Sequence, residues 1–183
     1  MTRIVAGEYG GRRLQTPPGD GTRPTTDRVR EAMFSSLQSE LGGFAGLRVL
    51  DLFAGSGALG LEALSRGAEA ADFVESDTRA AGVIKRNIAD LGCSGAKVLR
   101  TTVERFVRVP PAEPYDLIFL DPPYALPAEE VSALVATLAV PEWRGPDSIV
   151  VVERSTRDSF AWPEGVEGLR DKAYGETHLW YGR

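Results

Sequence analysis

The stretch Arg48-Val-Leu-Asp51-Leu-Phe-Ala-Gly55-Ser-Gly57-Ala-Leu-Gly60 begins as an apolar strand, passes through a glycine turn and enters a helix. Glycine suits such a turn, because the backbone there needs positive φ and a ligand must approach it closely. The start of the helix offers backbone N–H donors that have no acceptor within the helix. This strand–turn–helix unit favours an open α/β sheet that binds a ligand at the turn.

The rest of the chain repeats the same alternation of strand and helix. The expected strands lie at 48–53, 72–75, 96–101, 115–121 and 148–153, with helices near 59–66, 79–91 and 129–138. Such alternation is typical of parallel strands with helices on both faces. Residues 168–174 and 177–181 flank Gly175-Glu176, which indicates a closing antiparallel hairpin. The sequence therefore predicts an α/β fold with a mostly parallel, seven-stranded sheet.

The N-terminal region has a different pattern. Residues 3–7 and 12–16 flank Tyr9-Gly10-Gly11, as in a β-hairpin. We expect residues 1–24 to form a hairpin arm that contacts the substrate, and residues 25–183 to form the main domain. Thr26 can cap a helix that begins at Asp27 and ends before Gly42-Gly43. The apolar residues of this helix recur at helical spacing and would face the core: Val29, Met33, Phe34, Leu37 and Leu41.

Charge is distributed unevenly along the chain, whose net charge is −5. Residues 1–30 contain six arginines and three acidic residues, whereas the remainder holds 15 basic and 23 acidic residues. The arm is therefore basic and the body acidic, which favours contacts between the arm and phosphate groups. The candidate substrate-binding residues are Arg3, Arg12, Arg13 and Arg23.

Single copies of cysteine and histidine restrict the chemistry. Cys93 has no second cysteine to pair with, and His178 has no recognisable metal-binding partners, so we expect no disulfide and no metal. Both residues are interpreted as structural. No apolar run approaches the ~20 residues that a membrane span needs. We therefore expect a cytoplasmic protein that does not enter membranes.

Two acidic residues border the glycine turn. Asp51 comes immediately before it, and Glu75 ends the next expected strand, where an acid can accept hydrogen bonds from a ribose diol. A carboxylate at Asp51 would repel a pyrophosphate but attract an ammonium group. Ribose and ammonium together predict S-adenosylmethionine as the cofactor. The candidate binding residues here are Asp51, Phe53, Ala54, Gly55, Ser56, Gly57, Glu75 and Ser76.

A second motif, Asp121-Pro122-Pro123-Tyr124, follows the apolar strand 115–120. The two prolines remove backbone donors, so the loop offers carbonyl oxygens, the Asp121 carboxylate and an aromatic ring. An exocyclic amino group of a nucleic-acid base donates two protons and matches such acceptors. Tyr124 could stack on a base rotated out of its helix. Asp121, Pro122, Pro123 and Tyr124 are therefore the candidate catalytic residues.

Together with Arg23-Pro-Thr-Thr-Asp-Arg-Val-Arg-Glu-Ala-Met-Phe34, these motifs resemble the bacterial RsmD family. That family methylates N2 of one guanine in small-subunit (16S) ribosomal RNA. The resemblance covers nearly the whole chain and implies a Rossmann-like class I methyltransferase fold. It also implies that the turn 51–57 and Glu75 hold the cofactor, that Thr102 and Val103 lie beside its adenine, and that 121–124 is the catalytic loop. The implied partner is ribosomal RNA within an assembled or assembling small subunit, with contacts to ribosomal proteins left open.

Two other functions fit the same motifs. The first is an amino methyltransferase that acts on DNA adenine or on a protein glutamine. DNA-modifying enzymes usually add a target-recognition domain, and a protein substrate would leave the arginine-rich arm unexplained. The second is a nucleotide-binding module without catalysis, against which the intact Asp121–Tyr124 motif argues.

Overall fold

The computed structural model describes residues 2–19 and 26–183. The helices are α1 (Asp27–Leu41), α2 (Ala58–Ser65), α3 (Thr78–Leu91), α4 (Val103–Phe106) and α5 (Ala128–Leu138). The strands are β1 (Thr2–Arg3), β2 (Arg13–Leu14), β3 (Arg48–Leu52), β4 (Ala70–Val74), β5 (Ala96–Leu99), β6 (Tyr115–Leu120), β7 (Arg144–Ser155), β8 (Gly168–Tyr174) and β9 (Thr177–Gly182). Arg23 lies outside the described residues.

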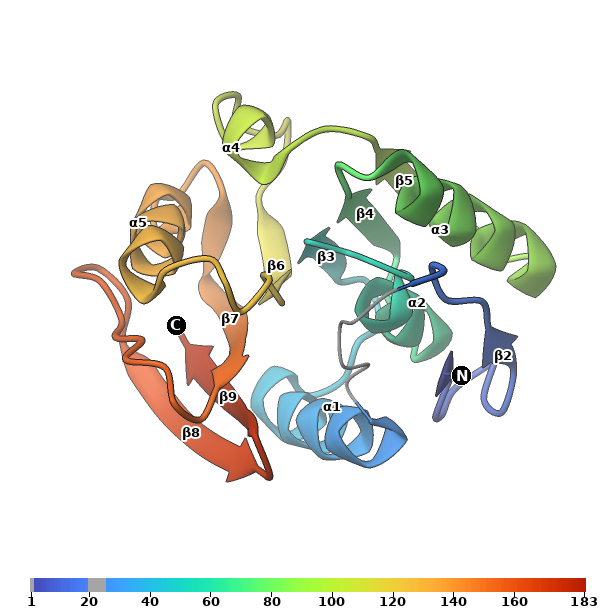
Figure 1. Ribbon diagram of the computed structural model, residues 1–183, viewed down its shortest axis with the longest axis horizontal. Coiled ribbons are helices and arrows are strands. Elements are labelled where there is room, and N and C mark those ends of the chain that lie inside the picture. Colours follow the sequence, from blue (N-terminus) through green and yellow to red (C-terminus); the bar gives the residue numbers. More distant parts are fainter. Residues whose placement is uncertain (1, 20–25) are drawn as a thin grey trace.

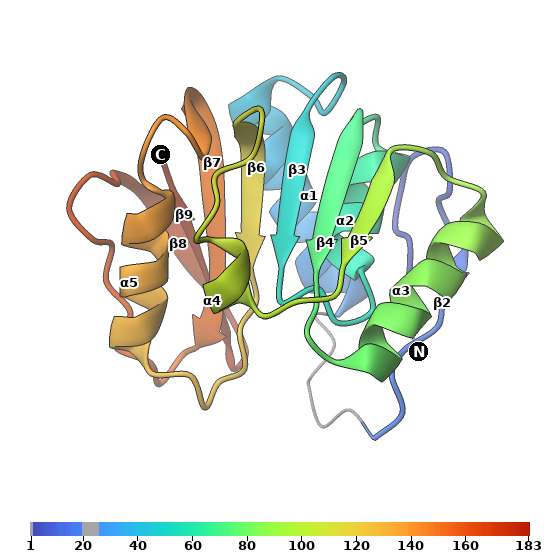
Figure 2. The ribbon, with the colours of Figure 1, turned by 90° about the horizontal axis from the view of Figure 1, so that it is seen from above.

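Seven strands form one sheet in the order β5-β4-β3-β6-β7-β9-β8. The five strands from β5 to β7 are parallel, and β9 pairs antiparallel with both β7 and β8. This arrangement confirms the predicted α/β class and the C-terminal antiparallel hairpin. Helices cover both faces of the sheet (Figures 1 and 2), α1 to α3 on one face and α4 and α5 on the other.

The parallel strands are apolar on both faces, because each face is covered by helices. Along β3, Val49 packs in the core on the α1–α3 side, whereas Leu50 packs in the core on the α4–α5 side. The same alternation recurs in β6, between Phe119 and Leu120. Two cores with the sheet between them therefore hold the strand ends in fixed positions.

The strand order reverses between β3 and β6. From β3 the chain proceeds outward to β4 and β5, and it then returns to place β6 on the other side of β3. Open α/β sheets bind ligands at such a reversal, beyond the carboxyl ends of the strands. Leu52 is in register with both Val74 and Leu120, so β3, β4 and β6 all end at the same edge. Both sequence motifs begin at this edge.

Helix α1 begins and ends as predicted. The Thr26 hydroxyl oxygen accepts a hydrogen bond from the backbone N–H of Val29 at 3.2 Å, and Gly42 closes the helix in a left-handed conformation. The predicted strands are also present, with ends that differ by a few residues. The expected strand 148–153 is the central part of the longer β7.

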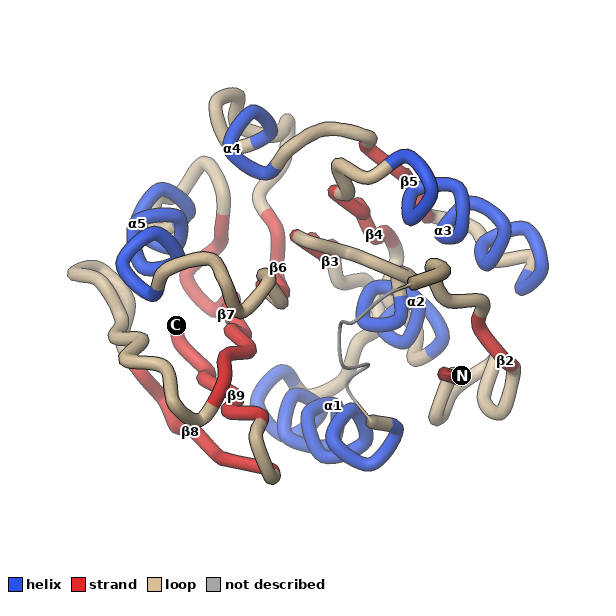
Figure 3. The backbone as a smooth tube through the Cα atoms, in the orientation of Figure 1, coloured by secondary structure: helices blue, strands red, loops and turns tan. Residues whose placement is uncertain are grey.

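The N-terminal hairpin has shorter strands than the sequence predicted. Within residues 2–19, only Thr2–Arg3 and Arg13–Leu14 pair as strands (Figure 3), although the pattern suggested strands over 3–7 and 12–16. The reason lies in Glu62 of α2, whose carboxylate accepts hydrogen bonds from the backbone N–H groups of Val5 and Ala6 at 2.8 and 3.0 Å. These donors are therefore not available to the opposite strand.

The hairpin packs closely on the main domain. Ile4 and Leu14 are buried in the same core as α1 and α2. Gly7 has a φ of 87°, and a Cβ atom there would lie 2.1 Å from the backbone oxygen of Ser65. Only glycine permits this approach. The hairpin is thus held to α2 by both packing and hydrogen bonds.

Candidate active site

A cavity of about 1590 Å³ opens at the carboxyl edge of the sheet. Its lining includes the glycine turn, the Asp121–Tyr124 loop and the end of the N-terminal hairpin near Pro17. Pockets for small molecules usually measure about 300–1,000 Å³. The cavity can therefore hold a nucleoside-sized cofactor together with a second group.

The glycine turn bends sharply after β3. Phe53 and Gly55 each have a φ of 59°, and Gly57 has a φ of 82°. Phe53 is the one described residue other than glycine with positive φ, a conformation that costs about 1–3 kcal/mol and is most common at functional sites. A Cβ atom added at Gly55 would meet no other atom within 4 Å. The turn therefore presents open backbone to the cavity, as the sequence predicted.

Asp51 lies beneath the turn with only 1% of its surface exposed. One carboxylate oxygen accepts a hydrogen bond from the backbone N–H of Gly60 at 3.0 Å. Burial raises the pKa of Asp51 to about 8, the Gly60 N–H opposes this rise, and the charge of Glu75 adds to it. An ammonium group in the cavity would favour the charged form of Asp51, because opposite charges stabilise each other at short distance.

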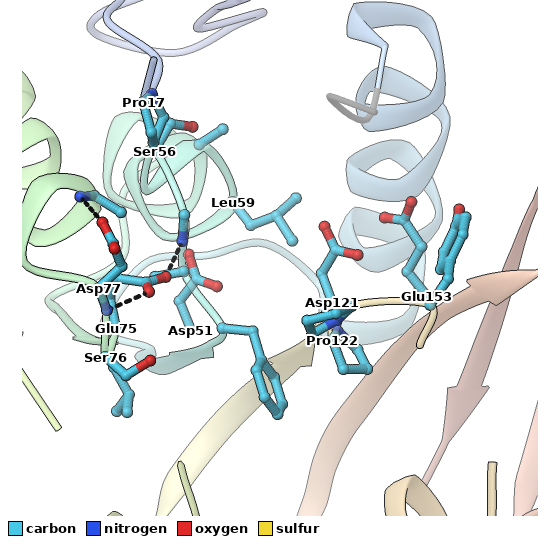
Figure 4. Close-up of a pocket in the computed structure, with 18 of the residues that line it drawn as sticks. Pro17, Asp51, Ser56, Leu59, Glu75, Ser76, Asp77, Asp121, Pro122 and Glu153 are labelled. Carbon is cyan, nitrogen blue, oxygen red and sulfur yellow. Dashed lines mark hydrogen bonds between the residues drawn. The ribbon is translucent and has the colours of Figure 1, made fainter. Parts of the chain in front are cut away.

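Glu75 connects the glycine turn to the start of α3. Its carboxylate accepts one hydrogen bond from the backbone N–H of Gly55 at 2.8 Å and another from that of Asp77 at 3.0 Å (Figure 4). A carboxylate has about four acceptor positions, so two hydroxyl groups can bind as well. Glu75 is thus oriented in advance at the place where the sequence predicted a ribose.

Thr102 and Val103 line the same cavity at the start of α4, a helix that the sequence did not reveal. The Thr102 hydroxyl oxygen accepts a hydrogen bond from the backbone N–H of Arg105 at 3.3 Å, and Val103 is buried. The remaining candidates in the turn, together with Ser76, also line the cavity: Phe53, Ala54, Gly55 and Ser56. Gly57 instead caps α2 behind them.

The Asp121–Tyr124 loop follows β6 on the opposite side of the cavity. Pro122 is buried, whereas 40% of the Tyr124 surface is exposed at the cavity. The Pro123 carbonyl accepts hydrogen bonds from the Leu126 N–H at 2.9 Å and from the Arg154 guanidinium at 3.3 Å. That carbonyl is therefore occupied within the protein. The acceptor of this loop that Figure 4 shows directed into the cavity is the Asp121 carboxylate.

Glu153, which the sequence reasoning did not select, also lines the cavity. It lies on β7 beside β6, with only 3% of its surface exposed. Val152 pairs with Leu120, so Glu153 and Asp121 follow equivalent positions of neighbouring strands. The sequence could have indicated Glu153, because this residue follows a run of apolar strand residues, as Asp51 and Glu75 do.

Three of the candidate substrate-binding arginines, Arg3, Arg12 and Arg13, lie on the hairpin and outside the cavity lining. Arg3 forms an exposed ion pair with Asp27 at 2.8 Å, and the Arg12 guanidinium donates to the Asp90 carbonyl at 2.6 Å. Arg13 is exposed on β2. Two exposed arginines that the sequence reasoning did not select, Arg79 and Arg157, line the cavity.

Comparison with known proteins identifies the family. A family model described as conserved hypothetical protein 95 matches residues 2–183. The chain belongs to this family. It is 36% identical over 181 residues to the ribosomal RNA small subunit methyltransferase D of Haemophilus influenzae, covering 94% of this chain and 89% of that protein. The resemblance to the RsmD family is thereby confirmed.

Solved structures show the same fold. A putative methyltransferase of Escherichia coli, 32% identical, superposes with a TM-score of 0.83 over 99% of this chain and 96% of that chain. A putative methyltransferase complexed with S-adenosylhomocysteine, 15% identical, shares the fold with a TM-score of 0.64 over 85% of this chain and 48% of that chain. The fold is therefore the Rossmann-like methyltransferase fold.

The second of these structures holds S-adenosylhomocysteine, and the sequence of this chain predicts S-adenosylmethionine as its cofactor. The residues around the turn fit it, since Glu75 offers acceptors to a ribose, Asp51 offers a carboxylate to an ammonium group, and Gly55 leaves the backbone open. Among the residues at 2–19 and 26–183, no group of three or more metal-binding side chains is assembled, and no helix is both long and apolar enough to cross a membrane.

Proposed function

We propose that this protein transfers a methyl group from S-adenosylmethionine to the exocyclic N2 amino group of a guanine in small-subunit ribosomal RNA. The observation that carries the proposal is the presence of both motifs in one cavity, with Asp51 and Glu75 on one side and Asp121 on the other (Figure 4). Tyr124 lines the same cavity. The names of its relatives support ribosomal RNA as the substrate. The reaction would take place in the cytoplasm, on an assembled or assembling small subunit.

Asp121 has the central role in the proposed reaction. S-adenosylmethionine supplies an electrophilic methyl group on a sulfonium. The amino nitrogen of guanine is a weak nucleophile, because its lone pair is delocalised into the ring. Asp121 accepts a hydrogen bond from this amino group and so favours the pyramidal geometry that frees the lone pair. In the transfer the amino nitrogen would take the methyl group, S-adenosylhomocysteine would leave, and the methylated nitrogen would release one proton to water. Catalysis then rests on orientation and charge placement.

Tyr124 supplies a surface for the base. A guanine inside a helix cannot reach the cavity, so the target nucleotide must rotate outward or already lie in a single strand. An exposed aromatic ring beside the acceptor can stack on the base and fix its plane, a contact worth about 1–3 kcal/mol. The half-exposed position of Tyr124 supports this role.

The basic arm and the cavity rim would contact the RNA backbone. Arg13 on the hairpin and Arg157 beside the cavity are exposed and can face phosphate groups. Arg3 and Arg12 remain candidates for the same role, as does Arg23 outside the described residues. Contacts with proteins of the ribosomal particle would add affinity that the acidic body cannot obtain from phosphate.

The proposal is tested by tritium transfer from labelled S-adenosylmethionine to four substrates: small subunits from a strain that lacks the gene, their deproteinised RNA, duplex DNA and bulk protein. We expect label in the subunits, and mass spectrometry of the digested RNA should locate it in N2-methylguanosine. Label in DNA adenine or in glutamine would replace this function with another amino methyltransferase. Cofactor binding without transfer to any substrate would indicate a non-catalytic module.

A further inference from the structure

Glu153 is a buried acid that the proposed methyl transfer does not yet use. It lies on β7, lines the cavity and has 3% of its surface exposed. Figure 4 shows its carboxylate next to that of Asp121, with both side chains on the same side of the cavity and apart from Asp51 and Glu75. Its position on the substrate side of the cavity suggests a role in binding the base.

Guanine has a donor pattern that matches this carboxylate. Its Watson–Crick edge carries two adjacent donors, the N1–H and one of the N2 hydrogens, which a carboxylate can accept with its two oxygens in parallel. Adenine presents an unprotonated N1 at the corresponding place and would set a lone pair against a negative oxygen. A carboxylate therefore selects guanine without any contact to the rest of the ring.

We propose that Glu153 determines specificity for guanine by accepting hydrogen bonds from N1–H and from one N2 hydrogen. The inference rests on the proposed function and adds to it the residue that recognises the base. Because β6 and β7 are paired at Leu120 and Val152, Asp121, which follows β6, and Glu153, which lies within β7, occupy the next positions of neighbouring strands. Glu153 then holds the N2 hydrogen nearer N1, and Asp121 holds the other. The amino nitrogen is fixed in position, and its faces stay open to the methyl group.

The decisive probe is 2-aminopurine, which keeps the N2 amino group but carries no proton on N1. Small subunits would be reconstituted with RNA that has either guanine or 2-aminopurine at the nucleotide found by mass spectrometry. We expect the wild-type protein to prefer guanine by more than about 100-fold in kcat/KM, because sites built to hydrogen-bond a donor discriminate strongly against analogues that lack it.

Glu153→Gln should invert this preference. The glutamine amide can donate to the unprotonated N1 of 2-aminopurine and accept from its N2 hydrogen, whereas it presents a donor to the N1–H of guanine. We expect kcat/KM on guanine to fall at least 100-fold and the ratio of 2-aminopurine to guanine to rise, with an unchanged Kd for S-adenosylmethionine. Glu176→Gln, at an exposed acid that also lines the cavity, is the matched control and should keep the wild-type ratio.

An unchanged ratio in Glu153→Gln, with full activity of the wild-type protein on guanine, would overturn the specificity role and leave the methyl transfer intact. Failure of the wild-type protein on guanine would instead remove the proposed function. If Glu153→Gln does not fold, Glu153→Asp provides the test of the specificity role. Its shorter carboxylate should lower kcat/KM on guanine by about tenfold or more at unchanged cofactor affinity, and a wild-type rate in this variant would also overturn the inference.

Discussion

The guanidinium of Arg154 donates a hydrogen bond to the backbone carbonyl of Pro123, with an Nη1–O distance of 3.3 Å. A second hydrogen bond, 2.6 Å long, runs from Nη2 to the Leu126 carbonyl. Arg154 has no exposed surface, and its charge is paired with Asp158. One buried side chain of β7 thus holds two points of the loop that carries the candidate catalytic residues.

This contact predicts that Arg154 acts on turnover through the loop. Arg154→Lys keeps the charge near Asp158 but cannot reach both carbonyls in the planar arrangement of a guanidinium. We expect kcat to fall at least tenfold, because small misplacements of catalytic groups are costly, while the Kd for S-adenosylmethionine stays unchanged. Steady-state kinetics and calorimetric titration would measure the two effects. Asp158→Asn, which keeps the hydrogen bonds to both carbonyls, is the control and should lose less activity.

Glu75 is predicted to hold the cofactor more than the fold. Glu75→Ala removes the acceptors expected to bind ribose and should weaken S-adenosylmethionine binding by about 1.5–3 kcal/mol. It also removes the partners of the Gly55 and Asp77 N–H groups, so a small drop in melting temperature should accompany the loss. Glu69→Ala, at the other end of β4 and exposed, is the control. Unchanged affinity in calorimetric titration would remove Glu75 from the site.

The charged carboxylate of Asp51 should lower the stability of the folded protein but strengthen cofactor binding. Its pKa is raised to about 8 by burial, so the folded protein retains a proton that the unfolded chain releases near pH 4. Stability should therefore fall as pH rises from about 4 to about 8, by at most about 1.4 kcal/mol per pH unit from this group, and then level off. Asp51→Asn should flatten this dependence and be the more stable protein at pH 8.

The same variant should bind S-adenosylmethionine more weakly, since an amide carries no charge for the ammonium group. Denaturant titrations of the cofactor-free proteins at pH 6 and pH 8, combined with calorimetry, would test both statements. A variant that is less stable than the wild type at pH 8 would show that the Asp51 carboxylate is not destabilised by burial.

The presence of the parallel strands and both motifs could be predicted from sequence, although the exact strand ends could not. Buried parallel strands appear in the sequence as apolar runs, and Asp51, Glu75 and Asp121 each follow such a run. Glu153 also follows an apolar run, so the same pattern could have identified it. Helix α4 could not be predicted from the sequence, because its four residues are too few to show helical periodicity. The role of Arg154 depends on carbonyls 28 and 31 residues away, which no local pattern reveals.

The hairpin arm shows a further limit of sequence. The backbone N–H of Val5 donates a hydrogen bond to the Glu62 carboxylate, which shortens the paired strands. The side-chain amide of Asn87 donates to the carbonyls of both Gln15 and Ser56. The arm is therefore linked to the glycine turn and to the core through Ile4 and Leu14. Deleting residues 1–20 would disturb all of these contacts, so single charge substitutions test the arm more cleanly.

Arg13 is predicted to bind substrate and not cofactor. Arg13→Ala should weaken binding to small subunits and reduce the slope of log affinity against log salt by about one, as expected for one lost phosphate contact. The Kd for S-adenosylmethionine should not change. Binding measured at several salt concentrations would check this, with the exposed Lys97→Ala on the edge strand β5 as control. Equal slopes for Arg13→Ala and the wild type would exclude Arg13 from the RNA interface.

The last prediction is an order of activities at Asp121 and Tyr124. Asp121→Ala should lower the rate by about 10²-fold or more while cofactor still binds, because it removes an oriented acceptor. Asp121→Asn should be milder, since its amide oxygen remains an acceptor. Tyr124→Phe should keep most activity, whereas Tyr124→Ala should lose it with the stacking surface. Single-turnover rates on subunits that lack the methyl group would establish the order. If Tyr124→Phe were as inactive as Tyr124→Ala, the hydroxyl would take part in proton transfer, and a mechanism based on stacking and orientation would be wrong.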